Sequence, residues 1–153
     1  MPDIQQDPES QGEEDCFPPL IHRSLVLTGP TASGKSSVAV ALAQRLDGEI
    51  VSLDSIAVYQ GMDIGTAKAS PEFCKLVPHH LIDLVPPSED FSVACYLRRA
   101  HETIDQIRSR GKVPIIAGGT PMFLKGVLRG FDPGPPADWD FRDAVESDVR
   151  EHG

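Results

Sequence analysis

The residues with the clearest chemical meaning form one short stretch with the pattern G-x-x-x-x-G-K-S. This pattern is typical of phosphate-binding loops, in which glycines let backbone N–H groups turn toward phosphate oxygens. Lys35 would add a positive charge at the phosphates, and the hydroxyl of Ser36 would reach Mg²⁺. The ligand is therefore expected to carry at least two linked phosphates. The loop consists of Gly29, Pro30, Thr31, Ala32, Ser33, Gly34, Lys35 and Ser36.

The segments on either side of this loop support the interpretation. An apolar stretch over 24–28 predicts a buried strand before it, and good helix formers over 36–46 predict a helix after it, with Gly48 as its stop. A phosphate-binding loop requires this order of strand, glycine turn and helix.

Two further positions could carry chemistry because each follows a predicted strand. Asp54 closes an apolar strand over 49–53 and could bind Mg²⁺, act as a general base, or simply cap a turn. Thr120 follows the strand over 113–117 and the turn Gly118-Gly119, where many ATPases with this loop have an aspartate. Its hydroxyl could serve the site, cap the next helix, or do both.

The remaining pattern alternates strands with helices and predicts an α/β fold with a parallel sheet flanked by helices. A helix over 91–110 is the strongest signal, with Ser92 or Asp90 as its cap and Gly111 as its end. His79 and His80 are neighbours on a predicted strand and would point to opposite faces, which favours structural roles. The other expected elements are a loop over 56–68, a short helix over 71–74, a strand over 78–85 and a helix over 121–129.

Charge and composition divide the 153 residues unevenly. Six of the 23 acidic residues lie in residues 1–20, which hold no Lys or Arg. The rest of the chain therefore holds 17 acidic and all 14 basic residues. Residues 1–20 therefore read as a disordered acidic extension, and 21–130 as the phosphate-loop core. The nearly neutral core does not show the basic footprint that is usual for nucleic-acid binding. The three cysteines, without C-x-x-C spacing, predict neither a disulfide framework nor a zinc site.

The last segment, 131–153, reads as a proline-rich connector and the start of a helix. Asp138 would cap this helix, and Phe141, Val145 and Val149 would form one apolar face that continues to the end of the sequence. This pattern indicates that the chain is a fragment or a truncated product. No apolar run is long enough for a membrane span, and no secretory or mitochondrial leader is apparent, so we expect a cytoplasmic protein.

Taken together, these motifs resemble the tRNA dimethylallyltransferase family, also called tRNA isopentenyltransferases. The resemblance extends from about Leu25 to Arg142. It is carried by the phosphate loop and by the strings V-S-L-D-S, Y-Q-G-M-D-I-G-T-A-K, H-H-L-I-D and A-G-G-T, at 51–55, 59–68, 79–83 and 117–120.

The resemblance implies a reaction and a set of roles. The family transfers a dimethylallyl group from its diphosphate to N6 of adenine 37 in the anticodon arm of tRNA. The loop would hold the diphosphate with Mg²⁺, and Asp54 and Thr120 would be catalytic. We also expect a monomer. The expected tRNA contacts are Asp54, Ser55, Ile56, Ala57, Thr120 and Arg142.

The sequence also departs from the family pattern. Phe123 stands where the family usually has a tyrosine, so a hydroxyl is lost there. Members of the family are about twice as long, with a helical insertion in which this chain would end. Three alternatives therefore stay open: a small-molecule kinase with the same loop, an adenylate isopentenyltransferase, and a truncated domain that binds diphosphates without catalysis.

Overall fold

A computed structural model of the protein describes residues 16–66, 68–132, 134 and 138–152. The chain divides into a core unit, Cys16–Phe131, and a second unit that holds the C-terminal helix. No helix in the described ranges is both long and apolar enough to cross a membrane.

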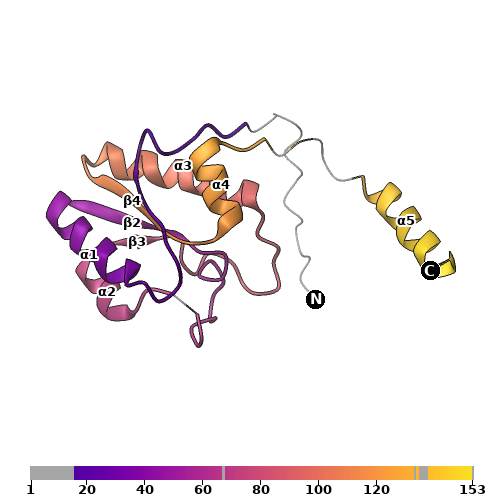
Figure 1. Cartoon of the computed structure of the whole chain (residues 1–153), viewed down its shortest axis with the longest axis horizontal. Helices are drawn as coiled ribbons and strands as arrows, with labels where there is room; N and C mark the ends of the chain where they lie inside the picture. The colour runs from indigo at the N-terminus through magenta and orange to yellow at the C-terminus, as the bar shows by residue number, and fades with distance from the viewer. Residues whose placement is uncertain (1–15, 67, 133, 135–137, 153) are drawn as a thin grey trace, which may run out of the picture. The chain divides into compact units, whose positions relative to one another are not determined.

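The core unit is built on a four-stranded parallel sheet with the strand order β1-β4-β2-β3 (Figure 1). Parallel strands need crossover connections, and helices supply them here, which confirms the predicted α/β class. The strands are β1 (Leu25–Leu27), β2 (Gly48–Leu53), β3 (His79–His80) and β4 (Val113–Gly118). The core helices are α1 (Lys35–Leu46), α2 (Pro71–Leu76), α3 (Val93–Ser109) and α4 (Pro121–Arg129).

Helices cover both faces of the sheet because successive strand residues point to opposite sides. Ile50 and Ile115 belong to an apolar cluster with α1, whereas Val51 and Ile116 belong to a second cluster with α3 and α4 (Figure 1). Both central strands are therefore buried on two sides, which explains their nearly continuous apolar sequences.

Helix α3 forms as its sequence predicts. The side chain of Ser92 caps it by accepting a hydrogen bond from the backbone N–H of Cys95, and Gly111 follows its end with φ at +73°. Four residues of its predicted apolar stripe are fully buried and belong to one core cluster, whereas Val93 at the start of the stripe is half-buried. The four are Leu97, Ala100, Ile104 and Ile107.

The predicted boundary of the N-terminal extension is wrong at its end. Phe17 and Leu20 lie in the core, and Phe17 pairs with Phe131 through backbone hydrogen bonds of 2.9 Å in both directions. Burial of two large apolar side chains outweighs the proline-rich, polar character of this segment. The core unit thus runs from Cys16 to Phe131 instead of from 21 to 130. The predicted extension over residues 1–15 lies outside the described residues.

Three smaller predictions also need correction. Helix α1 ends on Asp47, which adopts the left-handed conformation at φ +53°, and Gly48 opens β2 instead of stopping the helix. The strand expected over 78–85 is reduced to His79–His80, since Leu81 and Asp83 take positive φ values of +60° and +54°. Strand β1 is only partly buried because it lies at the edge of the sheet in the described core.

The two histidines of β3 bond to separate partners, as neighbouring strand positions predict. Nε2 of His80 lies 2.6 Å from Oε2 of Glu49, and Nδ1 of His79 lies 2.8 Å from the carbonyl oxygen of Val77. Burial opposes ionisation of Glu49, but hydrogen bonds from Arg110 and His80 outweigh it, so the pKa of Glu49 is lowered. This cluster anchors the amino-terminal end of β2.

A glycine at the end of β4 permits a close backbone approach between β4 and β2. A Cβ atom on Gly118 would lie 2.2 Å from the carbonyl oxygen of Leu53, a distance that backbone atoms cannot accommodate without moving. A Cβ atom on Gly119 would lie 3.4 Å from its nearest neighbour, the carbonyl oxygen of Gly29. Only the first substitution therefore forces β2 and β4 apart.

We predict that Gly118→Ala lowers the free energy of unfolding by about 1–3 kcal/mol, as expected for overpacking against immobile backbone. Gly119→Ala is the matched control and should change it by less than about 0.5 kcal/mol. Urea denaturation followed by circular dichroism measures both. Equal stability of the two variants would show that β2 and β4 do not approach as described.

Candidate active site

Three loops meet at the carboxyl edge of the sheet because the register of the strands brings their ends to one level. Ala117 of β4 pairs with Leu27 on one side and with Ser52 on the other. The phosphate loop after β1, the Gly-Gly-Thr turn after β4 and the Asp54 turn after β2 therefore leave the sheet side by side. With strands about 4.8 Å apart, the first and last of these loops begin roughly 10 Å from each other. In open α/β sheets this edge is where ligands bind.

The phosphate loop turns tightly into α1. Ala32 and Gly34 have φ values of +62° and +80°, and the helix begins directly at Lys35. The first backbone N–H groups of a helix have no partner within it, and they carry partial positive charge that favours an anion. The ammonium group of Lys35 folds back and donates to the carbonyl oxygen of Pro30, and the side chain of Ser36 lies in the exposed first turn.

Asp54 forms a tight turn with the residues that follow it. Its Oδ1 atom accepts hydrogen bonds from the backbone N–H groups of Ile56 at 2.8 Å and Ala57 at 3.2 Å. The turn-capping role that the sequence left open is therefore present. Its second carboxylate oxygen makes no hydrogen bond to the residues that the structure describes, so the group can cap the turn and still accept a proton.

Thr120 connects the loops after β4 and β2. It occupies the cap position of α4, but its side chain makes no capping hydrogen bond. Instead, Oγ1 accepts the backbone N–H of Ser55 at 2.9 Å and lies 3.4 Å from the hydroxyl of Ser55. Of the alternatives that the sequence left open, capping by the side chain is thus absent, and the hydroxyl of Thr120 holds the residue next to Asp54.

A buried aromatic pair contacts the end of β2 next to this site. The Tyr96 hydroxyl donates to the carbonyl oxygen of Ser52 at 3.1 Å, and its ring stacks on Phe123 with centroids 4.1 Å apart. Burial raises the pKa of Tyr96 well above its ordinary value, so this group stays a neutral donor. Phe123 is buried against this ring, and an apolar side chain suits that environment.

Two cavities differ in their relation to these loops. One of about 50 Å³ lies beside the phosphate loop, with Ser36, Ser52, His79 and Ala117 among its lining residues. Burial lowers the pKa of His79, so its ring there is held mainly neutral. The other, about 180 Å³, is lined by residues at the start of β2, including Gly48 and Glu49. The larger cavity therefore lies at the amino-terminal ends of the strands, whereas the three loops lie at their carboxyl ends.

Helix α5 (Trp139–His152) holds the remaining predicted site residue, Arg142. The side chain of Asp138 caps this helix by accepting a hydrogen bond from the N–H of Phe141 at 2.9 Å, as predicted. Because α5 belongs to the second unit, its placement relative to the three loops is not defined, and the role of Arg142 stays a prediction. Parts of the predicted connector, residues 133 and 135–137, lie outside the described residues.

Comparison with known protein families decides the relationship. Residues 57–153 match the family described as IPP transferase, and residues 23–84 match the family described as isopentenyl transferase. The chain belongs to the IPP transferase family. The first match covers well over half of the chain, including Ala57, Thr120 and Arg142. The phosphate loop and Asp54 lie in the second match.

Individual members of the IPP transferase family are similar over most of this chain. A tRNA dimethylallyltransferase of Rhodopirellula baltica is 57% identical over 145 residues, which are 90% of this chain and 43% of that protein. One from Geobacter sulfurreducens is 50% identical over 84% of this chain and 42% of its own length. The chain therefore spans less than half the length of these relatives.

Solved structures of the family share the fold. The full-length tRNA isopentenylpyrophosphate transferase of Bacillus halodurans superposes with a TM-score of 0.70 at 47% identity, covering 86% of this chain and 44% of the other. A eukaryotic dimethylallyltransferase acting on tRNA gives a TM-score of 0.64 at 34% identity over 67% of this chain and 25% of its own. These similarities confirm the predicted fold class of a sheet resembling that of the P-loop NTPases.

The sequence interpretation misses one partner in the polar network behind Asp54. Asp83 carries an ion pair to Lys68, and its backbone N–H donates to the carbonyl oxygen of Ala57 at 3.0 Å. The sequence pattern predicts instead that Asp83 continues a strand. A polar residue directly after two apolar ones is only a weak signal for a turn. The sequence therefore does not reveal that Asp83 adopts the left-handed conformation.

The Thr120 bridge generates a prediction. Thr120→Val keeps the shape but removes the acceptor for the Ser55 N–H, so amide hydrogen exchange at Ser55 should accelerate by about tenfold or more. Thr120→Ser is the matched control and should leave exchange within about twofold, because it retains the hydroxyl. If exchange at Ser55 is the same in the valine variant, Thr120 does not hold the Asp54 turn.

Proposed function

We propose that this chain is the diphosphate-binding part of an enzyme that transfers a dimethylallyl group from dimethylallyl diphosphate to N6 of adenosine 37 in tRNA. The observation that carries the proposal is the convergence of the phosphate loop, Asp54 and Thr120 at one sheet edge. Family membership and relatives named tRNA dimethylallyltransferase support it. The activity of the whole protein is part of this proposal.

The phosphate loop would hold the leaving group. An allylic diphosphate needs little covalent assistance because its cation is delocalised, but it does need stabilisation of the charge that grows on the departing diphosphate. Backbone N–H groups at the start of α1 would bind the phosphate oxygens, and Lys35 would exchange the Pro30 carbonyl for them. Breaking the C1–O bond then releases inorganic diphosphate into a site prepared for it.

Asp54 would accept the proton of the nucleophile. The N6 amine of adenine forms the new C–N bond and must lose a proton to yield the neutral product. Oδ1 of Asp54 is held by Ile56 and Ala57, which orients the second oxygen for this transfer. Thr120 would keep the turn in place through Ser55 and contact the same base.

The residues also fit a magnesium ion of the kind that accompanies a diphosphate. Among the described residues, no cluster of three or more His, Cys, Asp or Glu side chains is placed to bind a metal. A hydroxyl such as that of Ser36, together with phosphate oxygens and water, suits Mg²⁺, which is seldom enclosed by protein ligands alone. When bound, the ion would neutralise charge on the leaving diphosphate.

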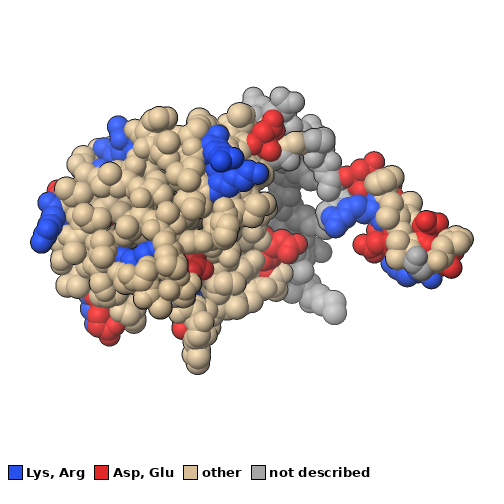
Figure 2. All heavy atoms as spheres, in the orientation of Figure 1, with Lys and Arg blue, Asp and Glu red and all other residues tan. Residues whose placement is uncertain are grey.

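Recognition of tRNA would involve the Asp54–Ala57 turn and Arg142. Figure 2 shows Lys and Arg in separate small groups on the visible face of the core, without one large basic patch. That face therefore offers no concentrated basic patch to the anticodon arm. We propose that the part of the relatives' length outside this chain supplies much of that contact, and that the protein acts in the cytoplasm as a monomer.

A small-molecule kinase is the main rival. A kinase would bind ATP at the same loop and pass its terminal phosphoryl group to an alcohol. The end of β4 favours the transferase over the kinase, because Gly-Gly-Thr replaces the aspartate that commonly binds magnesium there. Prenyl transfer to free AMP and diphosphate binding without catalysis are two further functions compatible with this loop.

One assay separates these functions. The chain is incubated with labelled dimethylallyl diphosphate and Mg²⁺, together with tRNA, AMP or ATP. Label in tRNA is the expected result. Label in AMP would identify an adenylate isopentenyltransferase, and ATP consumption without prenyl transfer would identify a kinase. Binding of the diphosphate without turnover would show that this chain needs more of the protein for catalysis.

The role of Asp54 gives a sharper prediction. Asp54→Asn retains an oxygen that can accept the N–H groups of Ile56 and Ala57, but it removes the base. Prenyl transfer in a tRNA-active form of the protein should fall by about 10²-fold or more, as is typical for loss of a general base. The affinity for inorganic diphosphate, measured by calorimetry, should change by less than about twofold. Loss of diphosphate affinity together with magnesium dependence would make Asp54 a metal ligand instead.

A further inference from the structure

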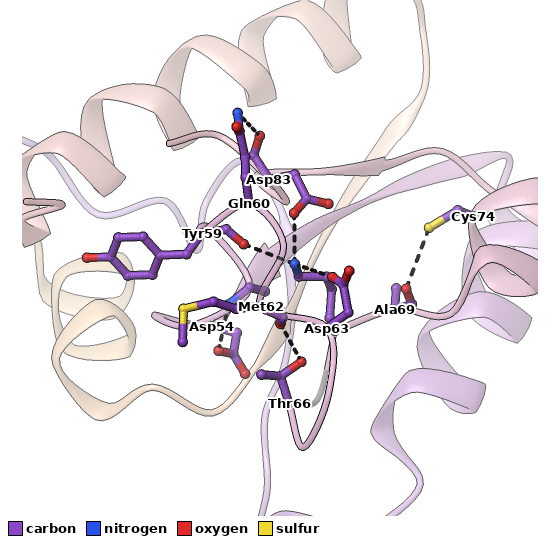
Figure 3. Close-up of polar contacts among 11 residues, drawn as sticks. Asp54, Tyr59, Gln60, Met62, Asp63, Thr66, Ala69, Cys74 and Asp83 are labelled. Atoms are coloured by element: carbon purple, nitrogen blue, oxygen red, sulfur yellow. Dashed lines mark hydrogen bonds and ion pairs between the residues drawn. The ribbon is translucent and has the colours of Figure 1, made fainter. Parts of the chain in front are cut away.

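Lys68 lies at the centre of a polar cluster behind the Asp54 turn. Its ammonium group contacts Oδ1 of Asp63 at 2.7 Å, Oδ1 of Asp83 at 2.7 Å and the carbonyl oxygen of Tyr59 at 3.0 Å. In Figure 3, dashed lines from the labelled residues Tyr59, Asp63 and Asp83 meet at one nitrogen atom. Its side chain is only 7% exposed. An ammonium group has three hydrogen atoms, and each has a partner here.

This saturation argues against the simplest role for a lysine near a phosphate site, which would be to bind the phosphate directly. An anion could accept a hydrogen bond from Lys68 only by displacing a carboxylate or the carbonyl from a nearly buried position. Lys35, by contrast, lies in the phosphate loop itself and has a single carbonyl partner among the described residues. Of these two lysines, Lys35 is therefore the better placed to bind a diphosphate.

A short chain of hydrogen bonds leads from Lys68 to the base. Lys68 holds the carboxylate of Asp83, the backbone N–H of Asp83 donates to Ala57 at 3.0 Å, and the N–H of Ala57 donates to Oδ1 of Asp54 at 3.2 Å. Gln60 adds a second tie, because its side-chain amide donates to the carbonyl oxygen of Asp83 at 3.1 Å. The position of Asp83 is thus transmitted to the Asp54 carboxylate through one residue, Ala57.

Asp83 needs such restraint because its backbone is unfavourable. Its φ of +54° lies in the left-handed region. Residues other than glycine adopt this conformation at a cost, which contacts with the surroundings must offset. Removing the ammonium group would also leave the carboxylates of Asp63 and Asp83 facing each other without a counter-charge. Both effects would loosen the backbone at Asp83.

Lys68 keeps its positive charge at neutral pH. Burial lowers the pKa of Lys68, but the hydrogen bonds to Asp63 and Asp83 outweigh burial, so the net pKa is raised.

We propose that Lys68 is a positioning residue for Asp54, acting through Asp83 and Ala57, and that it does not bind the anionic substrate. The effect of Lys68 on catalysis rests on the proposed role of Asp54 as a base. Its effect on the position of Asp54 does not, because the hydrogen bonds involved can be measured in the absence of any substrate.

Hydrogen exchange on the 153-residue chain tests this inference. Lys68→Met keeps the apolar stem and removes the charge, and Lys125→Met, in the exposed surface of α4, is the matched control. In Lys68→Met, the amides of Ala57 and Asp83 should exchange about tenfold faster or more, whereas affinity for inorganic diphosphate should stay within about twofold. Lys125→Met should change neither quantity. A protected Ala57 amide in a folded Lys68→Met variant would overturn the proposal, as would a tenfold loss of diphosphate affinity.

A pair of milder variants tests the route through Asp83 and serves if Lys68→Met does not fold. Asp83→Asn removes the charged partner that is linked to Ala57, whereas Asp63→Asn removes the partner in the exposed part of the loop. Only Asp83→Asn should accelerate exchange at Ala57 by several-fold. Equal effects of the two variants, or none from Asp83→Asn, would refute the linkage. Failure of tRNA prenylation with the exchange pattern intact would instead contradict the proposed function alone.

Discussion

The carbonyl oxygen of Leu53 is the point on which the candidate site depends. It accepts the backbone N–H groups of both Gly119 and Thr120, at 3.1 and 3.2 Å, while Gly118 packs against it without a Cβ atom. The loop after β4 is thereby fixed to the end of β2. Because Thr120 is held at Leu53, its hydroxyl can accept the backbone N–H of Ser55, two residues after Leu53. This hydrogen bond restrains the turn that contains Asp54.

This arrangement separates the two tasks that a prenyl transfer requires. Charge on the leaving diphosphate would be met at the start of α1, at the end of an edge strand of the described sheet, and the nucleophile would lose its proton at Asp54, two strands away. Packed helices cover both faces of the sheet between them. Under the proposed roles, strand spacing would set the distance between leaving group and base.

The sequence could predict the sheet, the helices and the phosphate loop because each has a local signal. Period, caps and the glycine pattern are properties of neighbouring residues. It could not predict that Phe17 and Leu20 are buried, since the partner of Phe17 is Phe131, more than a hundred positions away. The network behind Asp54 escapes prediction for the same reason, because Asp83 becomes important only when its backbone meets Ala57. Composition predicts a poor nucleic-acid binder, whereas similar proteins are named tRNA dimethylallyltransferases.

The identity of the ligand at the phosphate loop tests the account most directly. Isothermal titration calorimetry of the chain with Mg²⁺ can compare dimethylallyl diphosphate with ATP under the same conditions. The account predicts that dimethylallyl diphosphate binds at least about tenfold more tightly, a difference of about 1.4 kcal/mol, and that Lys35→Met abolishes that binding. Tighter binding of ATP, accompanied by transfer of its terminal phosphoryl group, would contradict it.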